Sequence, residues 1–239
     1  MKKFEFTGET MTTFFGKTLH RIRAISDIID AVGDVIVKAG QLGGWLEKEE
    51  NLSQDGNAWV YGNARVYGNA RVYGNARVCD DAWVYGNARV YGNARVCDDA
   101  WVYGNAWVCD DAVVKKSDYY LTVGPIGSRN DTTTFFRNAK GIIKVKCGCF
   151  IGTIDAFLEK VTETHSNNKH AVAYRAAAAL AVAQIDTTVT DDKLPKEREI
   201  VKPESFLNHV FHVGLNTNSV TIDENAFANN ENNFNKEDK

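Results

Sequence analysis

Residues 58–69 read Ala-Trp-Val-Tyr-Gly-Asn-Ala-Arg-Val-Tyr-Gly-Asn, and this six-residue unit decides the fold. Valine recurs at every sixth position from Val60 to Val114, and an alanine precedes each of these valines by two positions. Cys-Asp-Asp replaces Tyr-Gly-Asn three times, beginning at Cys79, Cys97 and Cys109. A strict period of six fits neither an α-helix, with 3.6 residues per turn, nor a long strand, with a period of two. Residues 55–114 are therefore predicted to form a repeat architecture.

Each unit predicts a short strand followed by a corner. Side chains alternate across a strand, so valine points inward while the residues on either side of it point outward. Glycine and asparagine readily take positive φ and suit a corner, and aspartate is the next most tolerant residue. The alanine after the corner is small enough to point inward beside the bend. Each unit is thus predicted to form one side of a prism, with its valine and alanine directed into an apolar interior.

The pattern Val-Tyr-Gly-Asn-Ala-Arg resembles the left-handed parallel β-helix of the hexapeptide-repeat family. That resemblance implies three hexapeptides per triangular coil, and about three coils over residues 55–114. The fold class expected is mainly β. A solenoid has open strand edges at both ends, so we expect an N-terminal β cap at residues 1–54 and a C-terminal α+β module at residues 115–185.

Stacked coils place residues that are three hexapeptides apart on one face, and one of the three faces is markedly aromatic. It carries, in two columns, Arg65, Trp83, Trp101, Tyr67, Tyr85 and Tyr103. Tryptophan, tyrosine and arginine are enriched at binding hot spots, and a large exposed apolar patch usually marks an interface. These six residues are predicted to bind a protein, either a host protein or a second copy of the chain. The alternative is that the rings stack on their own neighbours and shield the sheet.

The cysteines and aspartates of the repeat are predicted to have no metal-binding role. Asp80 and Asp81 stack on Asp98 and Asp99, and we expect solvated corner residues rather than a Ca²⁺ site. The five cysteines lack zinc-type spacing. Cys79 and Cys97 also stack, and in a reducing cytoplasm we expect free thiols. No cofactor is predicted.

Enzymatic activity is not expected from the repeat. Many hexapeptide-repeat proteins are acyltransferases that use a histidine to activate the acceptor, but residues 55–114 contain no histidine and no loop insertion. No catalytic residue is predicted, and a hexapeptide-type acyltransferase is the alternative.

The N-terminal segment is predicted to contain short strands around Phe4 and Phe6, at residues 18–25 and at residues 34–37. Leu46 and Leu52, six apart, look like an irregular first coil whose register slips by two before Val60.

The segment 115–185 is predicted to contain strands at 118–123, 132–137 and 142–150. A first helix follows Thr153, a plausible N-cap, and a second, alanine-rich helix spans residues 169–185.

The loop at residues 124–131 is the one chemically suggestive stretch of this module. Its residues Gly127, Ser128, Arg129 and Asn130 could hold an anion, which makes a small-ligand or nucleotide-binding protein a further alternative. The loop lacks the lysine and the strand-to-helix setting of phosphate-binding loops, so a structural turn is the competing interpretation.

Charge is distributed unevenly along a chain whose net charge is −3. Residues 115–185 hold ten basic and five acidic residues, whereas residues 186–239 hold six basic and eleven acidic residues. The second segment is predicted to be an acidic, partly irregular tail, in which residues 205–213 could dock as a strand or short helix. The overall acidity argues against nucleic-acid binding, and the sequence shows no signal peptide or membrane-spanning run, so a cytoplasmic location is expected.

Three stretches extend the resemblance beyond the repeat. They are Leu-Gly-Gly-Trp-Leu-Glu-Lys-Glu-Glu-Asn-Leu-Ser at 42–53, Gly-Ser-Arg-Asn-Asp-Thr-Thr-Thr-Phe-Phe at 127–136 and Cys-Gly-Cys-Phe-Ile-Gly-Thr at 147–153. In this order, around the repeats, they resemble hexapeptide-repeat proteins of bacteriophages and prophages over residues 1–185. The resemblance implies a phage accessory protein of the host cytoplasm and a homo-oligomer, for example a trimer. Our functional hypothesis is a non-enzymatic binding protein that inhibits a host defence component.

Overall fold

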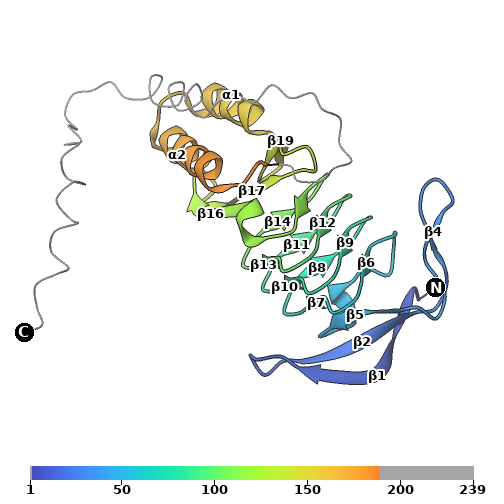
Figure 1. Ribbon diagram of the computed structural model, residues 1–239. Helices are drawn as coiled ribbons and strands as arrows, with labels where there is room; N and C mark the ends of the chain where they lie inside the picture. The colour runs from blue at the N-terminus through green and yellow to red at the C-terminus, as the bar shows by residue number, and fades with distance from the viewer. Residues whose placement is uncertain (1, 189–239) are drawn as a thin grey trace, which may run out of the picture.

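The computed structural model describes residues 2–188, which form a stack of coils flanked by two smaller parts (Figure 1). The N-terminal part contains β1 (Phe4–Thr12), β2 (Thr18–Ala24), β3 (Ile28–Ile29), β4 (Val35–Val37), β5 (Leu42–Leu46) and η1 (Glu49–Asn51). The coils contain β6 (Trp59–Val60), β7 (Arg65–Val66), β8 (Arg71–Val72), β9 (Arg77–Val78), β10 (Trp83–Val84), β11 (Arg89–Val90), β12 (Arg95–Val96), β13 (Trp101–Val102), β14 (Trp107–Val108) and β15 (Val113–Val114). The C-terminal part contains η2 (Ser117–Tyr119), β16 (Tyr120–Ile126), β17 (Asp131–Arg137), β18 (Ile143–Cys147), β19 (Phe150–Thr153), α1 (Ile154–His165) and α2 (Lys169–Gln184).

The repeat folds as a parallel β-solenoid with three faces. Each strand pairs in parallel with the strand three repeat units away, as Val84 does with Val66 and Val102. The aromatic face consists of β5, β7, β10 and β13, and its sheet continues into β2 and β1. The second face consists of β6, β9, β12 and β15, and we call it the disulfide face because Cys79 and Cys97, which follow β9 and β12, are bonded to each other. The third face consists of β8, β11 and β14. The predicted three-unit coil is confirmed by this pairing.

Valine and alanine fill the interior of the solenoid as predicted. All ten valines of the repeat are fully buried, and all ten alanines are at most 1% exposed. Each corner needs positive φ, which glycine supplies at most positions and which Asp80, Asp98 and Asp110 adopt at 56–59°. Burying each valine contributes about 1.5–3 kcal/mol, so the coils are stabilised mainly by this repeated layer.

The first coil is irregular in the way the sequence predicts. Leu46 pairs with Val66 and Leu52 with Val72, whereas Val60 pairs with Val78. Each leucine and its paired valine are two positions further apart in the sequence than Val60 and Val78. The slip in register therefore lies between Leu52 and Val60.

At the N-terminal end of the solenoid, side chains donate hydrogen bonds to backbone carbonyls of the first coils, which have no regular preceding coil to pair with. The Asn51 amide donates to the carbonyls of Gly68 (3.2 Å) and Ala70 (2.8 Å). The Lys3 ammonium donates to Gly56 (3.3 Å) and Ala58 (2.9 Å). Burial lowers the pKa of Lys3 to about 8, against which nearby Asp55 acts in the opposite direction. These contacts satisfy carbonyls that would otherwise form an open edge.

The C-terminal part lies across the opposite end of the coils (Figure 1). The Trp107 amide donates to Thr134 Oγ1 (3.0 Å), and Ala112 bridges to Asn138. The four antiparallel strands β16–β19 carry both helices, and the core between them includes Phe135, Phe157 and Tyr174.

In the C-terminal part, two of the three predicted strands and both predicted helices are confirmed in type, and one strand is wrong in extent. The stretch 142–150 is not one strand, because Gly148, with φ of 56°, turns the chain between β18 and β19. Thr153 is the N-cap of α1, since its hydroxyl accepts from the Ala156 amide. The predicted docking of residues 205–213 lies outside the described residues.

Candidate partner-binding surface

The aromatic face carries a column of guanidinium and indole groups. Pairing of the strands aligns Arg21, Trp45, Arg65, Trp83 and Trp101. The guanidinium carbon of Arg21 lies 5.0 Å from the Trp45 ring centroid, and that of Arg65 lies 4.7 Å from the Trp83 ring. The rings of Trp83 and Trp101 stack at 5.1 Å with an interplanar angle of 12°. Cation–π contacts thus join Arg21 to Trp45 and Arg65 to Trp83, and stacking joins Trp83 to Trp101.

A second column of tyrosines runs beside the first. Tyr67 and Tyr85 stack at 5.0 Å and 2°, and Tyr85 and Tyr103 at 5.4 Å and 14°. The predicted self-stacking is therefore present in both columns. Within the columns the ring faces cover one another, whereas Trp101 and Tyr103 at the ends are stacked on one face only.

Exposure increases along the face toward the C-terminal part. Tyr67 is only 5% exposed, Trp83 and Tyr85 are half-buried, and Trp101 and Tyr103 are 42% and 50% exposed. The prediction that Tyr67 projects to solvent is wrong, because Trp83 meets its ring edge-on and Tyr85 stacks on it. Burial, and next the neighbouring Tyr85 hydroxyl, raise the pKa of Tyr67 to about 12.

Two members of the guanidinium–indole column, Arg21 and Trp45, were missed by sequence reasoning. Trp45 precedes Leu46 as Trp83 precedes Val84, so the predicted first coil contained the signal for it. Arg21 reaches the column only because β2 pairs antiparallel with β5, which the repeat period does not indicate.

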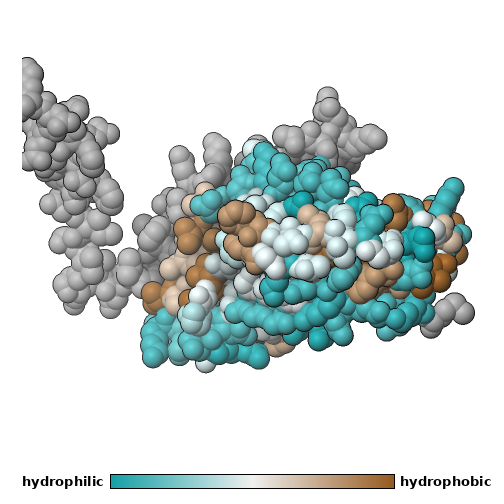
Figure 2. Space-filling view, turned by 90° about the horizontal axis from the view of Figure 1, so that it is seen from below, coloured by the Kyte–Doolittle hydropathy of each residue, from teal (hydrophilic) through white to brown (hydrophobic). Residues whose placement is uncertain are grey.

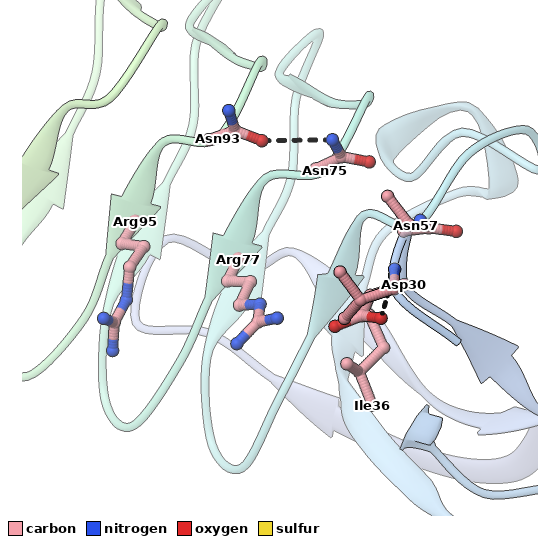
Figure 3. Close-up of a pocket in the computed structure, with 9 residues that line it drawn as sticks. Asp30, Ile36, Asn57, Asn75, Arg77, Asn93 and Arg95 are labelled. Carbon is pink, nitrogen blue, oxygen red and sulfur yellow. Dashed lines mark hydrogen bonds between the residues drawn. The ribbon is translucent and has the colours of Figure 1, made fainter. Parts of the chain in front are cut away.

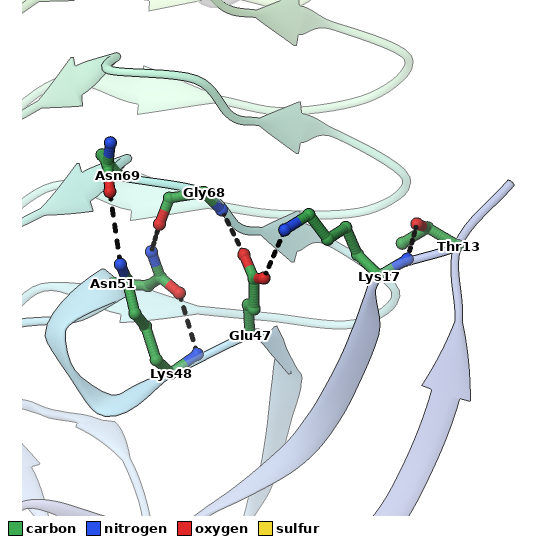
Figure 4. A network of polar contacts seen from close by, with 7 residues as sticks. All are labelled: Thr13, Lys17, Glu47, Lys48, Asn51, Gly68 and Asn69. Carbon is green, nitrogen blue, oxygen red and sulfur yellow. Dashed lines mark hydrogen bonds and ion pairs between the residues drawn. The ribbon is translucent and has the colours of Figure 1, made fainter. Parts of the chain in front are cut away.

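A polar network joins the β1–β2 hairpin to the base of this face (Figure 4). The Glu47 carboxylate accepts from the Gly68 amide (2.6 Å) and from the Lys17 ammonium (3.0 Å). Burial raises the pKa of Glu47, but the Gly68 amide and the Lys17 charge outweigh it and lower that pKa overall. Glu47 follows Leu46 as Tyr67 follows Val66, so it occupies the next position of the tyrosine column. That column therefore ends at a charged side chain.

A groove lies on the disulfide face, beneath the hairpin formed by β3 and β4 (Figure 3). Its volume is about 270 Å³. Arg77 and Arg95 extend side by side from β9 and β12, and the Asn75 amide donates to Asn93 (3.0 Å). At the hairpin, Val32 is 82% exposed. Figure 2 shows hydrophobic residues at the end of the molecule where Figure 1 places β4, and others at the opposite end.

The repeat coils match a known repeat description. A family model described as a YdcK β-solenoid repeat matches residues 58–72, 70–86, 82–98, 88–104 and 94–110. The starting points differ by six or twelve positions, as expected when each hexapeptide is one step. This chain is a β-solenoid repeat protein. No curated protein matches it.

The β-solenoid repeat description is not that of an obvious enzyme family. Histidines of the described residues lie outside the coils: His20 packs on Phe6 at 5.0 Å, and His165 lies 5.8 Å from His170 and 5.7 Å from Tyr174. Residues 2–188 include no helix that is both long and apolar enough to cross a membrane.

The two stacked cysteines of this β-solenoid protein form a disulfide, so the prediction of free thiols at Cys79 and Cys97 is wrong. Parallel pairing brings their Cα atoms to 4.5 Å, within the usual range for a disulfide. The expectation rested on the cellular compartment, whereas the coil spacing itself places the sulfur atoms together. Asp80 lies beside the pair, and its carboxylate accepts from the Asp98 amide (3.3 Å). Because both sulfurs are bonded to each other, they offer no thiolate to a metal.

The predicted anion loop is the turn between β16 and β17. Gly127, with φ of 71°, is packed so closely that a Cβ there would overlap the Tyr174 hydroxyl. Ser128, Arg129 and Asn130 are exposed, and the Asn130 amide donates to the Gly127 carbonyl (3.3 Å). Burial, followed by Cys147, raises the pKa of Tyr174 to about 12. The turn docks the hairpin on α2, which favours the structural interpretation, and anion binding stays a prediction.

Proposed function

We propose that this chain is a non-enzymatic binding protein that contacts another protein through the exposed end of the aromatic face. The observation that supports the proposal most directly is the exposure of Trp101 and Tyr103. They lie at the ends of two columns whose aromatic residues in the preceding coils are buried or half-buried. Stacking fixes these rings before binding, so little side-chain entropy would be lost on association. Large, rigid aromatic side chains of this kind are typical anchors of interfaces.

The geometry favours a protein partner over a carbohydrate. A sugar ring binds on the open face of an aromatic ring, and here stacking on Trp83 and Tyr85 already covers one face of each exposed ring. Ring edges carry partial positive charge and make edge-to-face contacts with aromatic side chains, and contacts with carbonyl and carboxylate groups. Arg65, half-buried beside Trp83, adds charge along the same column.

The finer parts of the proposal follow from the resemblance of the repeat to hexapeptide proteins of phages. They are a left-handed winding, a homo-oligomeric state such as a trimer, action in the cytoplasm of a bacterial host, and inhibition of a host defence component. The alanine–valine hexapeptide pattern supports the winding, and the partner-binding surface supports the inhibitory role.

A binding experiment with matched variants tests the proposal. The tagged chain is immobilised with bacterial lysate, and the captured protein is identified and then titrated in purified form. Trp101→Ala with Tyr103→Ala is expected to weaken binding about thirtyfold or more, because two anchors are removed. The control is Arg71→Ala with Tyr73→Ala on the third face, which should bind as the unchanged chain does.

Two outcomes contradict the proposal. Binding that survives the Trp101 and Tyr103 changes, or that is lost equally in the control, would mean that the face is wrongly assigned. The molecular mass in solution separates the two kinds of partner: a multimer that dissociates in the Trp101 and Tyr103 variant identifies a second copy as the occupant.

A further inference from the structure

Helix α2 has an apolar surface on its outer side as well as on its inner side. The inner side packs in the core through Ala171, Tyr174, Ala177, Ala178 and Ala181. The outer stripe of α2 consists of Val172, Ala176, Leu180 and Ala183, all exposed, with Val172 at 49% and Leu180 at 50%. No charged residue occurs between Arg175 and Asp186. A helix that is apolar all round is normally covered on both sides.

The chain leaves the described structure beside this stripe. Ile185 is buried, and the Asp186 amide donates to the Asp118 carbonyl (3.3 Å). The Arg137 guanidinium donates to the carbonyls of Asp186 (2.9 Å) and Thr188 (2.7 Å). The point from which residues 189–239 continue is therefore held at the C-terminal end of α2.

The length of the following segment allows it to return over the helix. From Val172 to Ile185 the helix axis rises about 20 Å, at about 1.5 Å per residue. The residues between 188 and 205 can span up to about 55 Å when extended. Residues 205–213 can thus reach any part of the outer stripe without displacing the anchored residues 185–188.

The composition of residues 205–213 suits this stripe. They read Ser-Phe-Leu-Asn-His-Val-Phe-His-Val and are the densest apolar stretch of the chain beyond residue 188. The charge of the surrounding segments is also complementary, since residues 115–185 have a basic excess of five and residues 186–239 an acidic excess of five. A tethered segment has a high effective concentration, in the millimolar range for a short flexible linker, and so competes well with a separate partner.

We propose that residues 205–213 of the same chain bind over the outer stripe of α2. The C-terminal segment then completes the second hydrophobic layer of the module, on the side of α2 away from the β-sheet. This contact is independent of the aromatic face, and failure of either proposal leaves the other standing.

Site-specific photo-crosslinking of the full chain tests this contact. A benzophenone amino acid is placed at position 180, where the exposed side chain tolerates replacement, and at Glu159 on α1 as the control. After irradiation, peptide mass spectrometry is expected to link position 180 to residues 205–213 within a protein of monomer mass. The control position should give no such link.

A second variant separates specific docking from chance proximity. Phe206→Ser with Phe211→Ser is expected to reduce the crosslink at least about tenfold, because apolar burial supplies the contact. The proposal is overturned if position 180 links to a second copy of the chain, to another part of the chain, or to nothing. It is also overturned if the crosslink is unchanged in the Phe206 and Phe211 variant.

Discussion

The solenoid coils and the C-terminal module bury their side chains by different means. In the coils, Val90 is buried between Val72 of the preceding coil and Val108 of the next, and every layer repeats the same contact. In the module, Phe135 of a strand meets Phe157 of a helix in a contact that no period relates. Whether a side chain of the coils is buried therefore follows from its place in the six-residue unit. Whether a side chain of the C-terminal module is buried depends on which elements, distant in the sequence, pack together.

The largest expected effect comes from a charge in the repeated core. Val90→Asp places an unpaired carboxyl group in a fully buried layer, and we expect the free energy of unfolding to fall by about 4 kcal/mol or more. Arg89→Asp, at the exposed neighbouring position, should cost only about 1 kcal/mol, from loss of the contact between its guanidinium and the Trp107 ring. Urea denaturation measures both. Equal losses would show that the coil interior is less dry than its packing indicates.

Reduction of the Cys79–Cys97 disulfide is expected to have the next largest effect. The bond joins positions separated by 18 in the sequence, so removing it should cost about 3 kcal/mol through the greater entropy of the unfolded chain. Thermal unfolding with and without dithiothreitol measures the difference, and Cys79→Ser with Cys97→Ser should be insensitive to the reductant. An unchanged melting temperature in the native chain would mean that the two sulfurs are not bonded in solution.

Two glycines with similar backbone conformations compare the two regions directly. Gly127 and Gly104 have φ of 71° and 64°, but only Gly127 lies against another element, at Tyr174. Gly104→Ala should cost about 1 kcal/mol from φ alone, and Gly127→Ala about 2–3 kcal/mol because the Tyr174 ring must also move. Chemical denaturation of the two variants measures this gap. Equal costs would show that Tyr174 yields without penalty.

A pH-dependent effect is expected from Lys3 beneath the first coil. Its pKa is lowered to about 8 in the folded chain, from 10.5, chiefly by burial. Between these values the unfolded chain binds more protons, so the free energy of unfolding should rise with pH from pH 8 to 10.5, by about 2 kcal/mol after allowance for solvent screening of the partly exposed ammonium group. Below pH 8 the cost of the buried charge is fully present. Lys3→Met should remove this part of the pH dependence, and an identical profile in the variant would contradict the assignment.

The sequence predicted the structure correctly wherever residue spacing or the type of a single residue determines it. The spacing of Leu46, Leu52 and Val60 revealed the first coil and its slip, and Thr153 marked the start of α1. The strand predicted over 142–150 was wrong because Gly148 gives a turn whose form depends on pairing with a neighbouring strand.

The candidate binding surface was predicted only in part. Five of its six residues, Arg65, Trp83, Trp101, Tyr85 and Tyr103, are at least partly exposed on one face. Tyr67 is buried by its neighbours, and Arg21 joins the column through an antiparallel hairpin. Side-chain exposure depends on what lies across the surface, and a repeat unit contains no information about that.

By itself, the sequence determined which side chains face the axis of the solenoid and which residues stack on one another, because both follow from alternation along a strand and a fixed coil length. Only the tertiary structure decided that Lys3 reaches the carbonyls of the first coils, that Arg21 joins the aromatic face, and that Gly127 lies against Tyr174. Each of these depends on the distance between atoms of different elements or coils, and packing, not the period of the chain, sets that distance.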